Sequence, residues 1–123
     1  MTFQMRTVVV KQIPATLNAK QERLFFLELK NSLNVDRPCI VLDCSKVSHM
    51  DEAVVHLLLC CLEEAMKRNG DVRLAGIPAA TGAILRHTGV DRLFEVFDTN
   101  ADAVNSFRRN PIGATSRSTA SAA

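Results

Sequence analysis

The chain has 123 residues, of which 47% are apolar and 23% are charged, and its formal net charge is +2. This length suits one domain with one core, and the composition is that of an ordinary soluble protein. The small charge and the absence of Trp and Tyr argue against nucleic acid as a partner. The longest apolar stretch, residues 53–62, is about half of the ~20 residues that a membrane span needs, and no signal-peptide pattern precedes it. We therefore expect a cytoplasmic protein that does not insert into a membrane.

The first half of the chain alternates strand and helix patterns. Residues 6–13 contain consecutive β-branched residues, which predict a strand. Residues 20–33 have apolar residues at helical spacing, and a turn over 34–38 ends this helix. Residues 39–42 are continuously apolar, as expected for a strand that is buried on both faces of a sheet. The apolar stripe of the helix is wide and is formed by Leu24, Phe25, Phe26, Leu27 and Leu29.

The same alternation continues in the second half, where the pair Asn69-Gly70 is typical of a helix end. Pro78 favours the first position of a further helix. The remaining predicted elements are a helix over 51–68, a strand over 71–75, a helix from Pro78 to near Gly89, a strand over 95–97, and a short helix over 100–107 with Ala101 and Val104 facing inward.

This order of elements predicts an α/β fold with a four-stranded, mainly parallel or mixed sheet and about four helices. From residue 110 the chain is rich in Ser, Thr and Ala and has no apolar period. We therefore predict one domain over residues 1–109 and a disordered tail over residues 110–123.

The chain offers little that indicates catalysis or metal binding. None of the four cysteines forms a C-x-x-C pair, so we expect reduced thiols that pack as small hydrophobes. His56 and Cys60 could share a helix face, but neither they nor His49 have a second pair at ligand spacing. The phosphate-binding, dinucleotide-binding and nucleophile-elbow motifs are absent. We expect no cofactor, no metal and no catalytic residue.

Three segments share an ordered pattern. The first is the strand end at Asp43 followed by Val47-Ser48-His49-Met50-Asp51, the second is NGDVRLAG over residues 69–76, and the third is LRHTGVDRLF over residues 85–94. In this order and spacing they resemble the STAS domain, which occurs in bacterial anti-sigma-factor antagonists and in the tails of sulfate-type transporters. The resemblance covers residues 6–107 and implies a STAS-like fold with a docking function.

In the resembled family, the helix start that corresponds to residues 51–54 has the pattern Asp-Ser-Ser/Thr-Gly, and its second hydroxyl residue is phosphorylated. This chain has Asp51, Glu52, Ala53 and Val54 instead. The resemblance therefore puts Ala53, which cannot be phosphorylated, at the phosphoacceptor position. A phosphate is stabilised at a helix N-terminus, and its charge would disrupt a partner that docks there. Without the acceptor, we expect docking without the usual switch.

Other residues near this helix start have two interpretations each. Glu52 either complements the helix dipole or partly mimics the phosphorylated state. Ser48 either caps the helix, in a capping-box pattern with Asp51, or accepts a phosphate. Ser45 is a second hydroxyl in the same loop. Asp43 and Asp51 together suggest the acidic pocket of a receiver domain, but the first strand lacks the acidic residues that such a pocket needs.

At 100° per residue, the helix that begins near Asp51 has a buried face, an exposed face and a flank between them. The predicted flank, Ala53, Leu57 and Cys60, forms a partly exposed apolar strip near Glu64, so we expect Leu57→Arg to leave the fold intact. Such a strip with a charged rim is typical of a partner site. The predicted partner-binding residues are Ser48, Asp51, Glu52, Ala53, His56, Leu57 and Cys60, the buried face holds Val54, Leu58, Cys61, Leu62 and Ala65, and the exposed face holds Glu52, His56, Glu63 and Lys67.

Two functions from different classes fit the resemblance. The leading one is a non-catalytic cytoplasmic module that docks on an anti-sigma factor of the serine-kinase type. The alternative is a small accessory subunit of a transporter complex, such as an ABC-type complex that traffics phospholipids. The sequence leaves the oligomeric state open, with a homodimer among the options.

Overall fold

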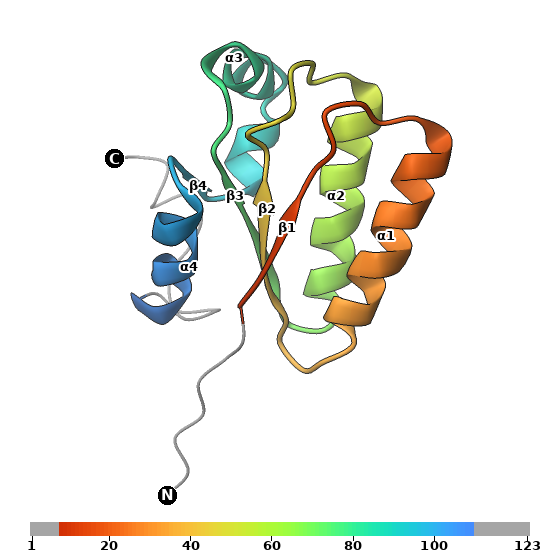
Figure 1. Ribbon diagram of the computed structural model, residues 1–123. Helices are drawn as coiled ribbons and strands as arrows, with labels where there is room; N and C mark the ends of the chain where they lie inside the picture. The colour runs from red at the N-terminus through yellow and green to blue at the C-terminus, as the bar shows by residue number, and fades with distance from the viewer. Residues whose placement is uncertain (1–7, 110–123) are drawn as a thin grey trace, which may run out of the picture.

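The computed structural model describes residues 8–109 and has the α/β architecture that the sequence predicts (Figure 1). Within these residues the sheet has four strands, all parallel, so the mixed arrangement that the sequence left open does not occur. The tail over residues 110–123 and the start of the predicted strand over residues 6–13 lie outside the described residues. In sheet order the strands are β1 (Val8–Gln12), β2 (Cys39–Asp43), β3 (Asp71–Ala75) and β4 (Val96–Phe97).

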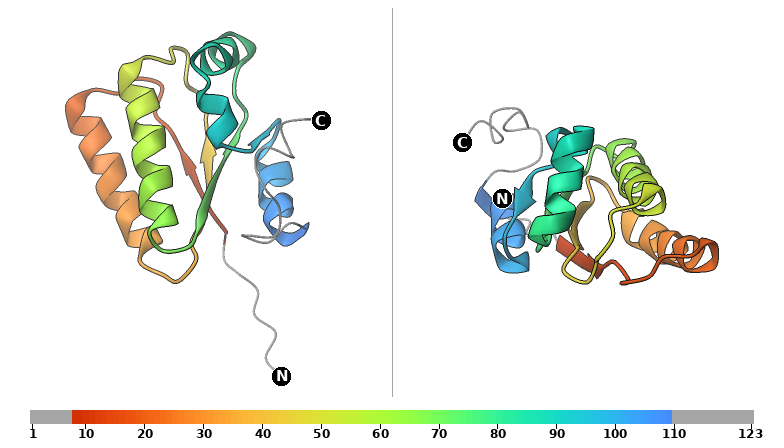
Figure 2. Two further views of the ribbon diagram at one scale, coloured as in Figure 1. Left: turned by 180° about the vertical axis from the view of Figure 1, so that it is seen from behind. Right: turned by 90° about the horizontal axis from the view of Figure 1, so that it is seen from above.

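The helices form a layer on each face of the sheet (Figures 1 and 2). Helices α1 (Ala19–Leu33) and α2 (Glu52–Met66) lie side by side on one face. Helix α4 (Asn100–Arg109) packs on the other face, and α3 (Ala79–Thr88) continues into the 3-10 helix η1 (Val90–Leu93) near the carboxyl ends of the strands. Among residues 8–109, no helix has the length and apolar character to cross a membrane.

The alternation of side chains along β2 and β3 builds two cores. Every residue of both strands is buried, as the continuous apolar run of β2 predicts. Because successive side chains of a strand point to opposite faces, Ile40 and Leu42 join the larger core under α1 and α2. Cys39 and Val41 join the smaller core under α4.

Helix α4 covers a buried charge rather than a purely apolar surface. Arg73 on β3 is only 3% exposed, and its Nη1 donates a hydrogen bond to Ser106 Oγ at 2.7 Å. Its guanidinium lies 3.9 Å from the centre of the Phe107 ring, and its Nε lies 3.5 Å from Asp71 Oδ2. The inward face of α4 is therefore set by Ser106 and Phe107 together with Ala103, whereas Ala101, predicted to face inward, is exposed.

The start and the buried face of α1 differ in detail from the sequence prediction. Helix α1 begins at Ala19, one residue earlier than predicted, because the Asn18 side chain accepts a hydrogen bond from the Gln21 N–H at 2.8 Å in a capping box. Its buried residues are Phe25, Leu29 and Leu33, while Leu24 and Leu27, at 51% and 54% exposure, lie outside the buried stripe.

The predicted turn at Asn69-Gly70 is confirmed. Asn69 has a left-handed backbone with φ of 60°, a conformation that Asn tolerates better than most residues. A side chain at Gly70 would collide with the carbonyl oxygen and ring of Pro38. The turn thus lets the start of β3 lie against the start of β2, where the Asp71 N–H donates to the Pro38 carbonyl at 2.9 Å.

A polar cluster joins the carboxyl ends of β1 and β2 to the start of α4. Asp43 Oδ1 accepts a hydrogen bond from the Ser45 N–H at 2.9 Å, and its Oδ2 accepts from Asn100 Nδ2 at 3.0 Å and from Gln12 Nε2 at 3.4 Å. Burial raises the pKa of the Asp43 carboxyl, but the hydrogen bonds from Asn100, Ser45 and Gln12 outweigh this effect and leave the pKa below its ordinary value. The ionised carboxylate therefore stabilises this edge of the fold.

We expect Asp43→Asn to lower the free energy of unfolding by about 1–3 kcal/mol, because one of the donors around this side chain would then face another donor. The unfolded carboxyl, with an ordinary pKa of 3.8, takes up a proton before the folded one does. The stabilisation is thus complete above that value and is lost as the pH falls through the lower pKa of the folded state.

Urea unfolding of wild type and variant at about pH 7, and then at successively lower pH, measures this difference. The gap between the two proteins should narrow in acid. A gap of the same size throughout would show that the charge of Asp43 contributes nothing.

Candidate functional site

Helix α2 begins where the loop after β2 leaves the core. Asp51 is its N-cap, and its Oδ1 accepts a hydrogen bond from the Val54 N–H at 3.1 Å. The prediction that Ser48 caps this helix is therefore wrong, and Ser48 is exposed in the loop. Val47 and Met50 are buried and hold the loop against the core, so the chain stays extended through Asp51 and turns into a helix only afterwards.

The first turn of α2 presents Glu52 and Ala53. Glu52 is exposed, and its carboxylate complements the positive end of the helix dipole. Ala53, the second helical residue, is half-buried and brings no polar group. The N–H groups of a first helical turn lack intrahelical acceptors, which suits the binding of a phosphate. The resemblance implies that Ala53 stands where such a phosphate would be attached, and Ala53 has no hydroxyl.

A groove of about 570 Å³ runs between α1 and α2, and Ala53 lies at its edge. His56 forms a contact across it, with its Nδ1 3.7 Å from Glu22 Oε1 on α1. The Cys60 Sγ lies 3.6 Å from His56 Nε2, one turn further along α2. Four predicted site residues thus meet at one groove. Its lining is Ala19, Glu22, Arg23 and Phe26 from α1, with Ala53, His56, Leu57 and Cys60 from α2.

The α1 side of this groove was absent from the predicted site. A signal for it exists in the order of elements, because successive right-handed crossovers between neighbouring parallel strands place their helices side by side on one face. The stripe Ala19, Glu22, Arg23 and Phe26 has the i, i+3, i+4, i+7 spacing of a single helix side. The element order and this spacing together could have located it.

Leu57 is 1% exposed and belongs to the larger core, so the prediction of a partly exposed Leu57 is wrong. The helical wheel placed α2 against the sheet alone, whereas α1 also covers its flank. Ala53 and Cys60 are half-buried and leave a narrower apolar surface than predicted. The two other faces of the wheel are confirmed: Val54, Leu58, Cys61, Leu62 and Ala65 are buried, and Glu52, His56, Glu63 and Lys67 are exposed.

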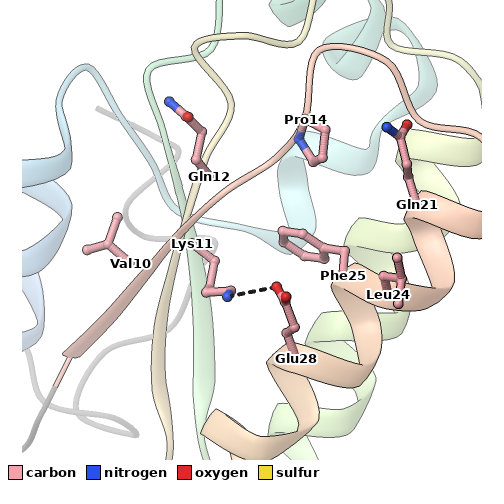
Figure 3. Close-up of a pocket in the computed structure, with 8 residues that line it drawn as sticks. All are labelled: Val10, Lys11, Gln12, Pro14, Gln21, Leu24, Phe25 and Glu28. Atoms are coloured by element: carbon pink, nitrogen blue, oxygen red, sulfur yellow. Dashed lines mark hydrogen bonds and ion pairs between the residues drawn. The ribbon is translucent and has the colours of Figure 1, made fainter.

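Two further clefts lie outside the predicted site. One, of about 330 Å³, separates the edge strand β1 from α1 and is crossed by an ion pair of 3.4 Å between Lys11 Nζ and Glu28 Oε1 (Figure 3). The other, of about 490 Å³, follows the far flank of α2, where Met66 is 53% exposed beside the half-buried Leu59. None of the predicted partner-binding residues lines either cleft.

Neither Cys60 at the groove nor Cys44 in the core has a thiol that favours nucleophilic chemistry. Burial raises the pKa of Cys60, and the negative charges of Glu63, Glu22 and Glu64 raise it further. Burial and the nearby Asp43 raise the pKa of Cys44 to about 12. A thiol with a raised pKa stays protonated at neutral pH and reacts slowly. Among residues 8–109, no group of three or more His, Cys, Asp and Glu side chains is arranged to hold a metal ion.

Comparison with known proteins identifies the family and finds solved structures with the same fold. A family model of the STAS domain matches residues 4–103 of the chain. Three solved structures share the fold. One is an anti-sigma-factor antagonist (STAS) domain protein from Planctomyces limnophilus, with a TM-score of 0.70 and 14% sequence identity over 80% of this chain and 89% of that one. Another is a putative anti-sigma factor antagonist from Thermotoga maritima, with a TM-score of 0.68 and 23% identity over 81% of this chain and 88% of that one. The third is the STAS domain of a SulP transporter from Vibrio cholerae, with a TM-score of 0.69 and 15% identity over 87% of this chain and 85% of that one.

The burial of Leu57 has a measurable consequence. Leu57→Ala is expected to lower the free energy of unfolding by about 2–5 kcal/mol, because it leaves a cavity between α1, α2 and the sheet. Cys60→Ala, one turn away at the groove, is the matched control and should cost about 1 kcal/mol or less. Chemical denaturation compares them, and equal losses would mean that the flank is as exposed in solution as the wheel alone suggested.

Proposed function

Since the chain belongs to the STAS domain family, we propose that it is a docking module rather than an enzyme, and that it binds an anti-sigma factor of the serine-kinase type. One observation carries the proposal: the first turn of α2 is continuous with the groove between α1 and α2, because Ala53 belongs to both. A partner that contacts the exposed helix start therefore also reaches apolar surface. Apolar surface beside charged groups is the usual composition of a docking site.

The two similar proteins described as anti-sigma-factor antagonists support this choice of partner. Ser48, Asp51 and Glu52 form the exposed part of the proposed contact, and Ala53, His56 and Cys60 form its groove side. Leu57 contributes as the buried floor of the groove and not as an exposed anchor.

We further propose that docking is constitutive. Ala53 offers no hydroxyl to a kinase, and Glu52 brings a single negative charge where a phosphoserine would bring nearly two. Glu52 points to solvent at a helix start, where a carboxylate contributes about 0.3–1 kcal/mol by complementing the dipole. Regulation would then act through the amount of this protein or through its partner.

A second candidate is an accessory subunit of a transporter complex in the cytoplasm. This candidate is supported by the similarity to the STAS domain of a SulP transporter, which covers 87% of this chain. The same α2 surface would then contact a transporter component, such as the ATPase of an ABC-type phospholipid-trafficking complex. Binding measurements with the two kinds of partner distinguish the candidates.

The absence of the hydroxyl predicts the outcome of a phosphorylation assay. Wild-type protein incubated with ATP and a serine-kinase-type anti-sigma factor should keep its mass, while Ala53→Ser should gain one phosphate at the new hydroxyl. Intact-mass measurement followed by fragmentation locates any phosphate. Modification of the wild type at the exposed Ser45 or Ser48 would disprove an unswitched module.

Docking itself is tested by calorimetric titration with the anti-sigma factor. Ala53→Arg puts a long charged side chain at the proposed contact and should weaken binding by roughly 2 kcal/mol or more, as for an interface hot spot. The matched control is Ile84→Arg on α3, where Ile84 is already exposed and lies outside the proposed contact. If the wild type binds the ABC ATPase but not the anti-sigma factor, the second candidate replaces the first.

A further inference from the structure

The groove between α1 and α2 has a defined direction. The two helices run parallel, since Glu22 near the start of α1 pairs with His56 near the start of α2, and Lys30 near the end of α1 acts electrostatically on Glu64 near the end of α2. Figure 1 shows both helices descending side by side from the same end of the molecule. The floor between these pairs is apolar, with Phe26 from α1 and Leu57 from α2.

The charges along the groove change sign from one end to the other. Near the helix starts, the three carboxylates of Glu22, Asp51 and Glu52 outnumber the two cations, Lys20 and Arg23.

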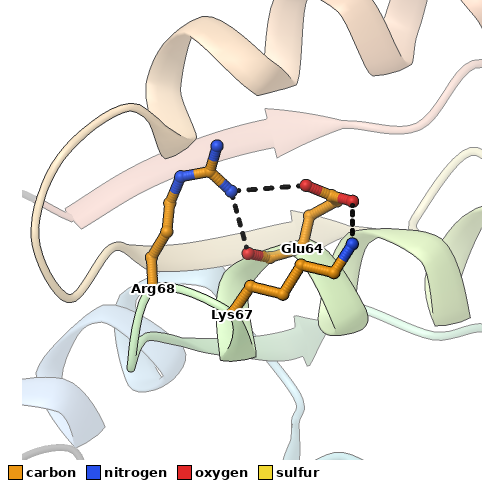
Figure 4. Close-up of polar contacts among 3 residues, drawn as sticks. All are labelled: Glu64, Lys67 and Arg68. Atoms are coloured by element: carbon orange, nitrogen blue, oxygen red, sulfur yellow. Dashed lines mark hydrogen bonds and ion pairs between the residues drawn. The ribbon is translucent and has the colours of Figure 1, made fainter.

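Near the helix ends, cations gather around one carboxylate. Glu64 Oε2 accepts from Lys67 Nζ at 3.1 Å, and Glu64 Oε1 accepts from Arg68 Nη1 at 3.3 Å (Figure 4). These hydrogen bonds from Lys67 and Arg68 lower the pKa of Glu64, and Lys30 adds to the effect. Glu63 also acts electrostatically on Lys67 and on the groove residue Cys60. The three cations at this end of the groove, Lys30, Lys67 and Arg68, still outnumber its two carboxylates, Glu63 and Glu64, so positive charge prevails.

We propose that the groove takes one amphipathic helix of the partner, lying antiparallel to α1 and α2, with an acidic first turn beside Lys30 and Lys67 and a basic last turn beside Glu22 and Glu52. The inference rests on the proposed function, because it states how the docking partner engages α2. Opposite charges then meet at both ends of the groove, and the helix dipoles of neighbours are antiparallel. Acidic first turns and basic last turns are also the arrangement that a helix itself favours.

The walls of the groove select a helix over an extended peptide. Both walls are helices, whose backbone groups are engaged in their own hydrogen bonds, so the groove offers no ladder for an added strand. Helix ridges fit the space between two helices at interaxial distances of about 8–10 Å.

The direct test uses two stapled helical peptides of equal composition, each as long as the 15-residue helices α1 and α2. Both carry leucines on one face. One has glutamates in its first turn and lysines in its last, and the other has the reverse. The staple keeps both helical, so only the direction of charge differs. Titration into ¹⁵N-labelled protein should show the first peptide binding roughly tenfold more tightly, with amide shifts at Phe26, Ala53 and Cys60. Equal affinities, or shifts confined to the Met66 flank, would overturn the proposal.

A pair of variants tests whether the full-length partner binds in the same groove as the peptide. Cys60→Arg places a charge in the groove and should weaken binding of both the first peptide and the anti-sigma factor at least roughly tenfold. Met66→Arg, on the far flank of α2 where Met66 is already exposed, should leave both affinities unchanged. Circular dichroism verifies that each variant folds.

The outcomes separate this inference from the proposed function. If the anti-sigma factor binds Cys60→Arg at wild-type strength but fails to bind Ala53→Arg, the partner class stands and the groove inference falls. If the first peptide occupies the groove while the anti-sigma factor does not bind at all, the groove stands and the partner class falls. Concentration-dependent shifts at the groove without peptide would identify a second copy of this chain as the occupant, against the proposal.

Discussion

The packing of α1 against α2 is the constraint on which the functional surface depends. Both helices cover the same face of a parallel sheet, and their contact buries Leu57 while leaving Ala53 and Cys60 half-exposed on either side of it. Without α1, the flank of α2 would be an open apolar strip. With α1 in place, the strip becomes the floor of a groove whose lining includes Glu22 and Arg23 from α1 and the imidazole of His56 from α2. The same contact therefore stabilises the fold and shapes the surface that we propose for docking.

The identity of the residue at the start of α2 then sets the behaviour of that surface. Asp51 is the N-cap of α2, and Glu52 in the first turn is exposed to solvent. The resemblance to the family puts Ala53, which has no hydroxyl, at the phosphoacceptor position. A docking module that keeps its scaffold and loses its acceptor would bind its partner at all times, so its control would lie outside the domain.

Local sequence patterns were sufficient for the fold because each strand and helix has a strong period or a clear terminator. The buried run of β2, the Asn69-Gly70 turn and the buried face of α2 are all present as predicted. The failures lie where contact between elements decides. Leu57 is buried by α1, Ala101 is displaced from the interior by the arrangement around Arg73, and the loop anchored by Val47 and Met50 moves the helix cap from Ser48 to Asp51. A helical wheel contains none of these contacts, so the α1 half of the groove was not predicted.

The central claim is that the anti-sigma factor docks on the start of α2 and the groove between α1 and α2. Amide hydrogen exchange of this chain, alone and with the anti-sigma factor at saturation, tests it most directly, since one experiment reports the protection of amides throughout the domain. The account predicts that new protection concentrates in the first turns of α2 and along the sides of α1 and α2 that face each other, from Ala19 to Phe26 and from Ala53 to Cys60. Protection concentrated instead along β1 and the adjoining cleft with α1, or on the Met66 flank, would contradict it.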